Sequence, residues 1–222
     1  MRCDVGEHRV EGHFQRPDLA LQFPPSGAAA RPDASVAAHV VHTVRGPWAE
    51  TPDGVRVVLY DGSREKLRPL FELAEDSPTH LASCIEDGRV LVALRGTDVL
   101  GHLQLVDTDQ ADTFEIKNMA VREDLQCTGV GRRLVHCAID LVCRESGKRL
   151  LVATAAAGIG NLHFYQRLGF RMQAIERDAF TPRTGYELCT LTDGIELRDR
   201  VWLDLPLDPA APSCRTRQAG TS

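Results

Sequence analysis

Residues 115–133 read EIKNMAVREDLQCTGVGRR, and this stretch decides the fold of the chain. Residues 115–121 alternate as a strand does, residues 126–131 form a glycine loop, and residues 134–142 bring apolar side chains to one side of a helix. Such a turn leaves several backbone N–H groups exposed at the helix N-terminus, where the aligned peptide dipoles add partial positive charge. Glycine lets the backbone approach a ligand closely. The stretch therefore predicts an anion site.

The loop does not match the common nucleotide-binding patterns. A P-loop needs Gly-Lys followed by Ser or Thr, and Arg132-Arg133 is not that sequence; a dinucleotide fingerprint needs a third glycine where Leu134 stands. The loop and its flanks instead resemble motif A of the GCN5-related N-acetyltransferases (GNAT superfamily), Gln/Arg-x-x-Gly-x-Gly/Ala. Residues 161–170 (NLHFYQRLGF) resemble motif B of that family. The motifs lie in the family's order, and the resemblance covers roughly residues 54–205.

The resemblance implies a fold and a co-substrate. The fold is the acyl-CoA N-acyltransferase (GNAT) fold, an α/β domain with a mixed central sheet of six to seven strands flanked by helices. The co-substrate is acetyl-CoA, whose pyrophosphate is held by loop amides and whose pantetheine arm follows a strand that splays from its parallel neighbour. The cofactor-binding residues that the resemblance implies are Met119, Ala120, Val121, Gln126, Cys127, Thr128, Gly129, Val130, Gly131, Arg132, Asn161 and Tyr165.

Three parts of the chain differ in composition. We expect residues 1–52 to form a low-complexity, flexible extension, in which residues 36–44 could pair as a short strand. Residues 53–206 would form the acetyltransferase domain, and residues 207–222 a flexible tail. Apolar patterns in the domain predict strands at 55–60, 89–94, 99–106, 113–121, 149–155, 170–176 and 197–203. A helix joins the strands at 113–121 and 149–155, so these two strands should be parallel, and the last strand should be inserted in the sheet.

Glu115 matches the position of the general base in the family. A free alkylamine has a pKa of about 10.4, so only about one molecule in a thousand is unprotonated at neutral pH, and an acetylating enzyme needs a base. Alternation places Glu115, Lys117, Met119 and Val121 on one face of their strand. A solvated Glu115 that pairs with Lys117 is the alternative that the sequence leaves open.

Tyr165 matches the family tyrosine that often acts as general acid. A phenol with a pKa of about 10 can give a proton to a departing thiolate, whose pKa is about 8.5; a tyrosine packed in the core is the alternative. Asn161 lies one helical turn earlier on the same face, where it would contact the cofactor, cap the helix or do both. Cys127 lies at a helix N-terminus, where thiol pKa values fall, but no motif supplies a His or Asp partner, so we expect an incidental role.

Composition narrows the class of protein. The net charge of −5 disfavours a general nucleic-acid binder. No apolar run is long enough to span a membrane, and the N-terminus lacks an apolar signal core. The seven cysteines include no Cys-x-x-Cys pair. We therefore expect a cytoplasmic protein without a metal, nucleic-acid or membrane partner, and a homodimer stays open.

The activity that the resemblance implies is transfer of an acetyl group from acetyl-CoA to a primary amine of a small molecule, for which an aminoglycoside-like antibiotic is one candidate. The amine would attack directly in a ternary complex. Two alternatives stay open: an acceptor amine on a protein or peptide, and a non-catalytic acyl-CoA sensor. The presence of both Glu115 and Tyr165 argues against the sensor. Phe180 and Trp202 could line the acceptor pocket, with aromatic packing as the alternative.

Overall fold

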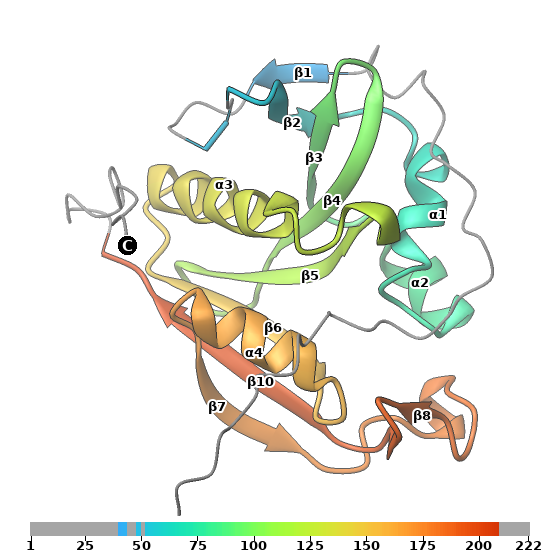
Figure 1. Ribbon diagram of the computed structural model, residues 1–222. Coiled ribbons are helices and arrows are strands. Elements are labelled where there is room, and N and C mark those ends of the chain that lie inside the picture. The colour runs from blue at the N-terminus through green and yellow to red at the C-terminus, as the bar shows by residue number, and fades with distance from the viewer. Residues whose placement is uncertain (1–39, 44–47, 50–51, 209–222) are drawn as a thin grey trace, which may run out of the picture.

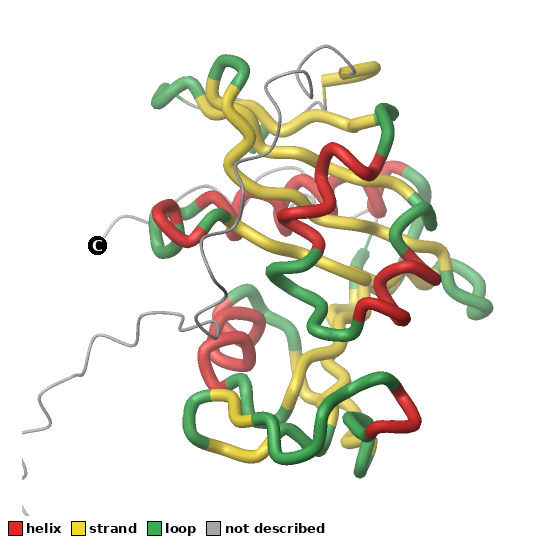
Figure 2. The backbone as a smooth tube through the Cα atoms, turned by 90° about the vertical axis from the view of Figure 1, so that its right-hand side faces the viewer, coloured by secondary structure: helices red, strands yellow, loops and turns green. Residues whose placement is uncertain are grey.

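The computed structural model describes residues 40–43, 48–49 and 52–208. Its centre is a mixed sheet with helices on both faces (Figures 1 and 2), which confirms the predicted fold class. The strands are β1 (Val40–Thr43), β2 (Val55–Tyr60), β3 (Arg89–Arg95), β4 (Asp98–Asp107), β5 (Thr113–Val121), β6 (Arg149–Ala155), β7 (Arg171–Glu176), β8 (Leu191–Thr192), β9 (Ile195–Glu196) and β10 (Arg200–Pro206). The α-helices are α1 (Arg68–Phe71), α2 (Pro78–Cys84), α3 (Val130–Arg144) and α4 (Ile159–Arg167).

The first half of the sheet is an antiparallel meander from β2 to β5. The order of the main sheet is β1-β2-β3-β4-β5-β6-β10-β7. Seven of these strands form the sheet of six to seven strands that was predicted, and β1 adds an eighth at the edge. β1 comes from the segment in which the sequence allowed a short strand. The other predictions for residues 1–52 and 207–222 fall almost entirely outside the described residues.

The second half of the sheet is built around the α3 crossover. β5 and β6 are parallel, as predicted, because α3 carries the chain from the end of one strand back to the start of the next. β10 lies between β6 and β7 and is antiparallel to both, which confirms that the last strand is inserted in the sheet. That strand runs three residues later than the predicted range of 197–203.

Each face of the sheet has its own core. The apolar side of α3, with Leu134 and Val142, packs with Tyr165 of α4 and residues from β4 to β6 on one face. On the other face, Leu70 and Phe71 of α1 pack with Val90 and Val92. Burying an apolar side chain of this size contributes about 1.5–3 kcal/mol, so the two cores hold the strands around the site in place.

A β-bulge interrupts β5 at Lys117. Gln104 pairs with Asn118 and the next residue, Leu105, pairs with Ile116, so one residue of β5 is left between the two pairs. Beyond the bulge the faces exchange. Met119 packs with Ile116 on the α3–α4 side, whereas the Asn118 amide donates to the carbonyl of Phe71 in α1 at 3.3 Å. The expectation that Met119 and Val121 share a face with Glu115 is therefore wrong, because simple alternation cannot anticipate a bulge.

Candidate active site

The glycine loop between β5 and α3 has the conformation that an anion site needs. Gly129 has φ +91° and precedes α3 as its N-cap, and Cys127 has φ +61°. The N–H groups of Gly129, Val130, Gly131 and Arg132 have no acceptor among the described residues. These donors converge at the positive end of the 15-residue helix α3. The loop therefore fits a phosphate or diphosphate.

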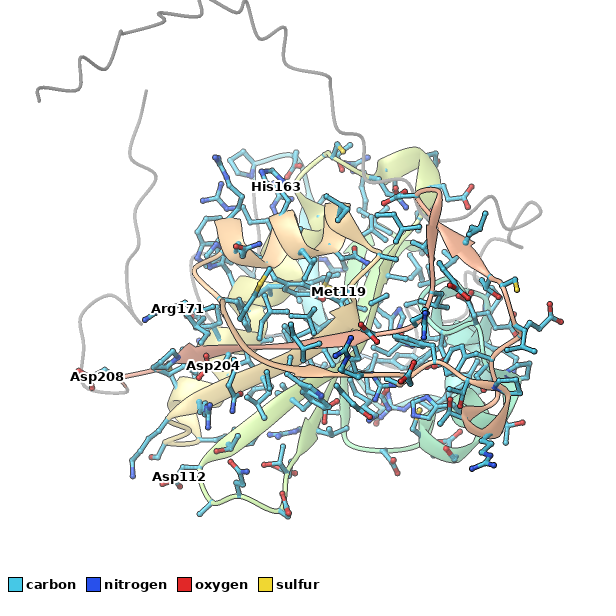
Figure 3. The ribbon with its side chains drawn as sticks, turned by 90° about the horizontal axis from the view of Figure 1, so that it is seen from below. Asp112, Met119, His163, Arg171, Asp204 and Asp208 are labelled. Atoms are coloured by element: carbon cyan, nitrogen blue, oxygen red, sulfur yellow. The ribbon has the colours of Figure 1, made fainter. Side chains whose placement is uncertain are left out.

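The loop is fastened to the strand that precedes it. The Gln126 amide donates to the carbonyl of Val121 at 3.5 Å, and the Thr128 hydroxyl donates to the carbonyl of Leu125 at 2.5 Å. Of the remaining residues that the resemblance assigned to the cofactor, Ala120 and Val121 are buried at the end of β5. Met119 lies between the sheet and α4, whereas His163 projects from the outer side of α4 (Figure 3).

The sheet opens beside this loop. β5 and β6 pair from Thr113 with Arg149 to Ile116 with Val152, and among the residues that the structure describes the second half of β5 has no strand partner on that side. Figure 1 shows the two strands diverging toward the loop. The separation of neighbouring strands leaves backbone groups of β5 available to an extended ligand. This arrangement agrees with the splayed strands that the resemblance implied.

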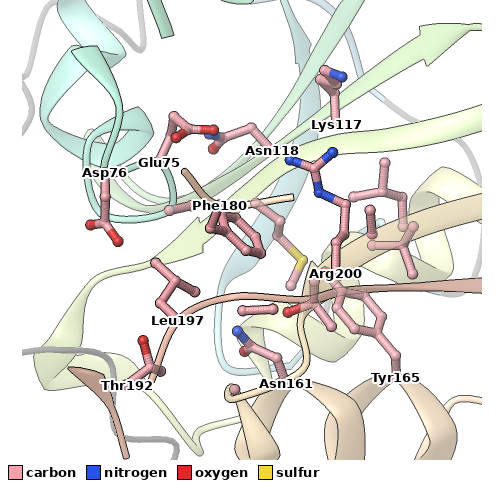
Figure 4. A pocket seen from close by; sticks show the side chains of 18 of the residues that line it. Glu75, Asp76, Lys117, Asn118, Asn161, Tyr165, Phe180, Thr192, Leu197 and Arg200 are labelled. Atoms are coloured by element: carbon pink, nitrogen blue, oxygen red, sulfur yellow. The ribbon is translucent and has the colours of Figure 1, made fainter. Parts of the chain in front are cut away.

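A cavity of about 210 Å³ lies at the opening. It is lined from several directions: by the α1–α2 link, by β5 and β6, by α4, and by the link between β7 and β10 (Figure 4). Of the residues predicted from the sequence, the cavity brings together Glu115, Met119, Asn161 and Tyr165. Phe180 and Trp202 line it too, as the sequence allowed. Residues 120–132 do not line this cavity.

Glu115 enters the cavity from β5. Its side chain is 15% exposed, and the Lys117 ammonium lies 3.4 Å from its carboxylate. Pairing with Lys117 was the alternative that the sequence left open; the pair is present, and Glu115 also reaches the cavity.

Tyr165 and Asn161 reach the cavity from α4 (Figure 4). The Tyr165 ring packs edge-on against Phe164 and Phe170, with centroid separations of 5.1 and 5.6 Å. Burial raises the pKa of Tyr165, so its hydroxyl keeps its proton. That hydroxyl has no hydrogen-bond partner within the part of the chain that the structure describes. α4 begins at Ile159 with Gly158 as its N-cap, so Asn161 does not cap the helix.

Residues 59–170 match the model of the Acetyltransferase (GNAT) family. The chain is also 33% identical over 153 residues to "Uncharacterized N-acetyltransferase YvbK" of Bacillus subtilis (strain 168), an alignment that covers 68% of this chain and 97% of that protein. The chain belongs to the GNAT family. It is an acetyl-CoA-dependent N-acetyltransferase.

Two solved structures resemble this acetyltransferase over nearly their whole length. A Bacillus subtilis acetyltransferase in complex with CoA shares 34% identity with a TM-score of 0.63, and the match covers 69% of this chain and 99% of that one. A GNAT family acetyltransferase from Elizabethkingia anophelis with acetyl-CoA bound shares 26% identity with a TM-score of 0.64, covering 70% and 99%. One relative holds CoA and the other acetyl-CoA, and both molecules carry a diphosphate, the kind of group that the glycine loop of this enzyme fits.

Several cavity residues were not found by sequence reasoning. Glu75 and Asp76 come from the irregular link between α1 and α2, and Tyr186 and Arg200 come from the link after β7 and from β10. No motif marks these positions, because the two links meet only in the folded protein. The hydroxyl of Tyr186 donates to Glu75 across 111 residues of sequence at 2.7 Å, which joins the two walls of the cavity.

A buried polar group lies behind the cavity. His102 of β4 is fully buried, and its ring packs against Phe71 in a tilted arrangement with the ring centroids 4.1 Å apart. The side chain of Asn118 interacts with the His102 ring, and this contact opposes the larger effect of burial on the pKa of His102. Burial lowers the pKa of His102 to about 3. The imidazole is therefore neutral in the folded acetyltransferase at any ordinary pH.

Cys127 is an exposed free thiol in the glycine loop and does not line the cavity. Within residues 40–43, 48–49 and 52–208, no group of three or more His, Cys, Asp or Glu side chains is placed to hold a metal ion. In the same ranges, no helix has the length and apolar character needed to cross a membrane.

Proposed function

We propose that this acetyltransferase moves the acetyl group of acetyl-CoA to a primary amine of a small molecule by direct attack in a ternary complex. The observation that carries the proposal is the shared cavity: Glu115, Asn161 and Tyr165 line one space at the point where β5 and β6 separate. The unpartnered amides of the glycine loop lie at the end of the same strand and hold the diphosphate. The thioester would thus be presented beside a base and an acid.

The residues divide the reaction between them. Glu115 accepts the proton that the amine nitrogen loses as it bonds to the thioester carbonyl carbon, directly or through a water molecule. Backbone N–H groups of Met119–Val121 donate to the carbonyl oxygen as it gains negative charge. The carbon–sulfur bond then breaks, and Tyr165 gives its proton to the departing sulfur. Asn161, one turn before Tyr165, positions the pantetheine arm. The amide product and free CoA leave.

The position of Glu115 supports the assignment of the base. Its carboxylate lies 3.4 Å from the Lys117 ammonium and remains 15% exposed toward the cavity. An amine that binds between Glu115 and Tyr165 would be close to both proton-transferring groups, and such positioning can supply a large part of a rate enhancement. The neutral, buried Tyr165 is suited to giving a proton.

The test is release of free CoA thiol from acetyl-CoA in the presence of amines, aminoglycosides and peptides, together with calorimetric titration of CoA. We expect CoA binding, and turnover that depends on a small amine. Binding of CoA without turnover of any amine would instead identify an acyl-CoA sensor. Turnover of peptides alone would favour a protein or peptide acceptor. Absence of CoA binding to the folded protein would overturn the assignment of the glycine loop.

A further inference from the structure

The acceptor cavity has an excess of carboxylates. Its lining includes Glu75, Asp76, Glu115 and Asp193 against only two residues that are always cationic at neutral pH, Lys117 and Arg200. Lys117 is paired with Glu115 at 3.4 Å, and Arg200 is paired with Glu176 at 3.2 Å. In the described part of the chain, Glu75, Asp76 and Asp193 have no Lys or Arg partner. The excess negative charge therefore gathers on the side of Glu75 and Asp76, away from Lys117 and Arg200 (Figure 4).

Hydrogen bonds hold the Glu75 carboxylate in place, and no Lys or Arg in the described part of the chain pairs with it. One carboxylate oxygen accepts from the Ser77 N–H at 2.9 Å and from the Tyr186 hydroxyl at 2.7 Å. The other lies 2.7 Å from Nδ1 of His80. The side chain is 13% exposed, so its position is fixed while part of its surface still faces the cavity. A fixed carboxylate loses little conformational entropy when a cation binds to it.

The wall beside Glu75 is aromatic. Phe180 packs edge-on against Tyr186 at 4.8 Å, and both rings line the cavity. The face of an aromatic ring attracts a cation, and the Arg200 guanidinium already lies over the Phe180 ring, 5.1 Å from its centroid. Burial, and next to it the charge of Glu75, raise the pKa of Asp76, and a bound cation would offset both effects.

Asn118 belongs to the back wall of the cavity, and Figure 4 shows it beside Glu75. It is only 7% exposed, and its amide nitrogen donates to the carbonyl of Phe71 at 3.3 Å. Its amide oxygen is buried, and the side chain interacts with His102 behind the cavity. Asn118 is therefore tied to the protein, and the groups left to meet a cation in the cavity are the carboxylates.

We propose that the acceptor carries a second cationic group besides the amine that is acetylated, and that Glu75 and Asp76 bind it. This inference rests on the proposed function and narrows its acceptor to diamines, polyamines or amino sugars. A carboxylate-bearing acceptor such as an amino acid fits less well, because both cationic side chains of the cavity already have carboxylate partners. The reacting amine would then lie toward Glu115 and Tyr165, with the second ammonium at the opposite end.

The test compares α,ω-diamines with monoalkylamines of equal chain length in the thiol-release assay. A charge-assisted hydrogen bond is expected to raise kcat/KM for the best diamine over its matched monoamine by roughly tenfold or more. In Asp76→Asn that ratio should fall toward one. Since Asp76 makes no hydrogen bond or ion pair within the described part, this nearly isosteric change should leave the fold intact. Glu75→Gln should reduce the ratio as well.

Asp109→Asn is the matched control, because Asp109 is an exposed carboxylate in the β4–β5 turn that does not line the cavity. Its ratio should equal that of the wild type. Equal turnover of diamines and monoamines, or a ratio that Asp76→Asn leaves unchanged, overturns the second cationic site while the proposed function stands. Failure to acetylate any small amine overturns the proposed function, and this inference with it.

Discussion

Tyr165→Phe separates the proposed chemistry from packing. The Tyr165 hydroxyl has no hydrogen-bond partner among the described residues, while its ring is buried between Phe164 and Phe170. Phenylalanine keeps the ring and removes a polar atom whose burial is not compensated by a hydrogen bond. The free energy of unfolding should therefore change by no more than about 1 kcal/mol, and it can increase.

The effect on turnover should be larger. General acid catalysis typically contributes about 10²–10⁴-fold, and a thiolate with a pKa of about 8.5 needs less help than an alkoxide. We expect kcat of Tyr165→Phe to fall by roughly 10–100-fold, which corresponds to about 1.4–2.7 kcal/mol in the activation free energy. Because burial raises the pKa of Tyr165, the hydroxyl stays protonated up to at least about pH 10. The wild-type profile of kcat against pH should therefore show no loss from this group below that pH.

The measurements are thiol release at saturating acetyl-CoA, calorimetric titration of CoA, and urea unfolding. Tyr60→Phe is the matched control, since Tyr60 is equally buried but lies outside the cavity and its hydroxyl donates to the carbonyl of Ser63 at 3.1 Å. The control should lose about 1 kcal/mol of stability and no turnover. If Tyr165→Phe turns over within twofold of the wild type while binding CoA normally, Tyr165 is a packing residue and the assignment of the acid is wrong.

The other predictions concern Glu115 and His102. Glu115→Gln keeps the shape of the side chain and removes the base, so kcat with an amine at pH 7 should fall by roughly 10²-fold or more while the Kd for CoA stays the same; normal turnover would remove the assignment. Burial lowers the pKa of His102 to about 3, against about 6.5 in the unfolded chain. Below pH 6.5 the unfolded state therefore binds more protons than the folded state, and the free energy of unfolding falls as the pH falls. Urea unfolding should show about 2 kcal/mol less stability from this group at pH 5 than at pH 7. His102→Leu should abolish that loss, whereas the exposed control His163→Leu should retain it.

The glycine loop and its flanking strand could be predicted from the sequence because their chemistry is local. The positive φ of Gly129 and the unpartnered amides that follow it depend on a few adjacent residues. The strands at 113–121 and 149–155 were predicted with their observed bounds, because both lie between turn residues, the first starting with alternating polar and apolar residues and the second being mostly apolar. The parallel pairing of these strands follows from the helix that connects them.

The side-chain directions on β5 could not be predicted from the same residues. The bulge at Lys117 depends on the register with β4, and residue alternation contains no information about a partner strand. This bulge turns Asn118 toward α1 and Met119 toward α4. Without it, Asn118 would lie on the face of Ile116 and its amide would enter the apolar core. The bulge thus places a polar side chain at the acceptor cavity while keeping the α3 core apolar.

The acceptor end of the cavity was beyond sequence reasoning for a different physical reason. Glu75 and Tyr186 lie 111 residues apart, in two links without periodic pattern, and meet through one hydrogen bond of 2.7 Å. The spacing of apolar residues indicates how a helix or strand packs against the sheet. It does not indicate where two irregular links meet, and the hydrogen bond between Tyr186 and Glu75 depends on that. In the proposed function, the co-substrate is bound by a local motif, and the acceptor is bound by links that can change without disturbing the sheet. Specificity can therefore diverge in this family while the acetyl-transfer site is kept, and the second cationic site at Glu75 and Asp76 should be sought in each relative from its structure.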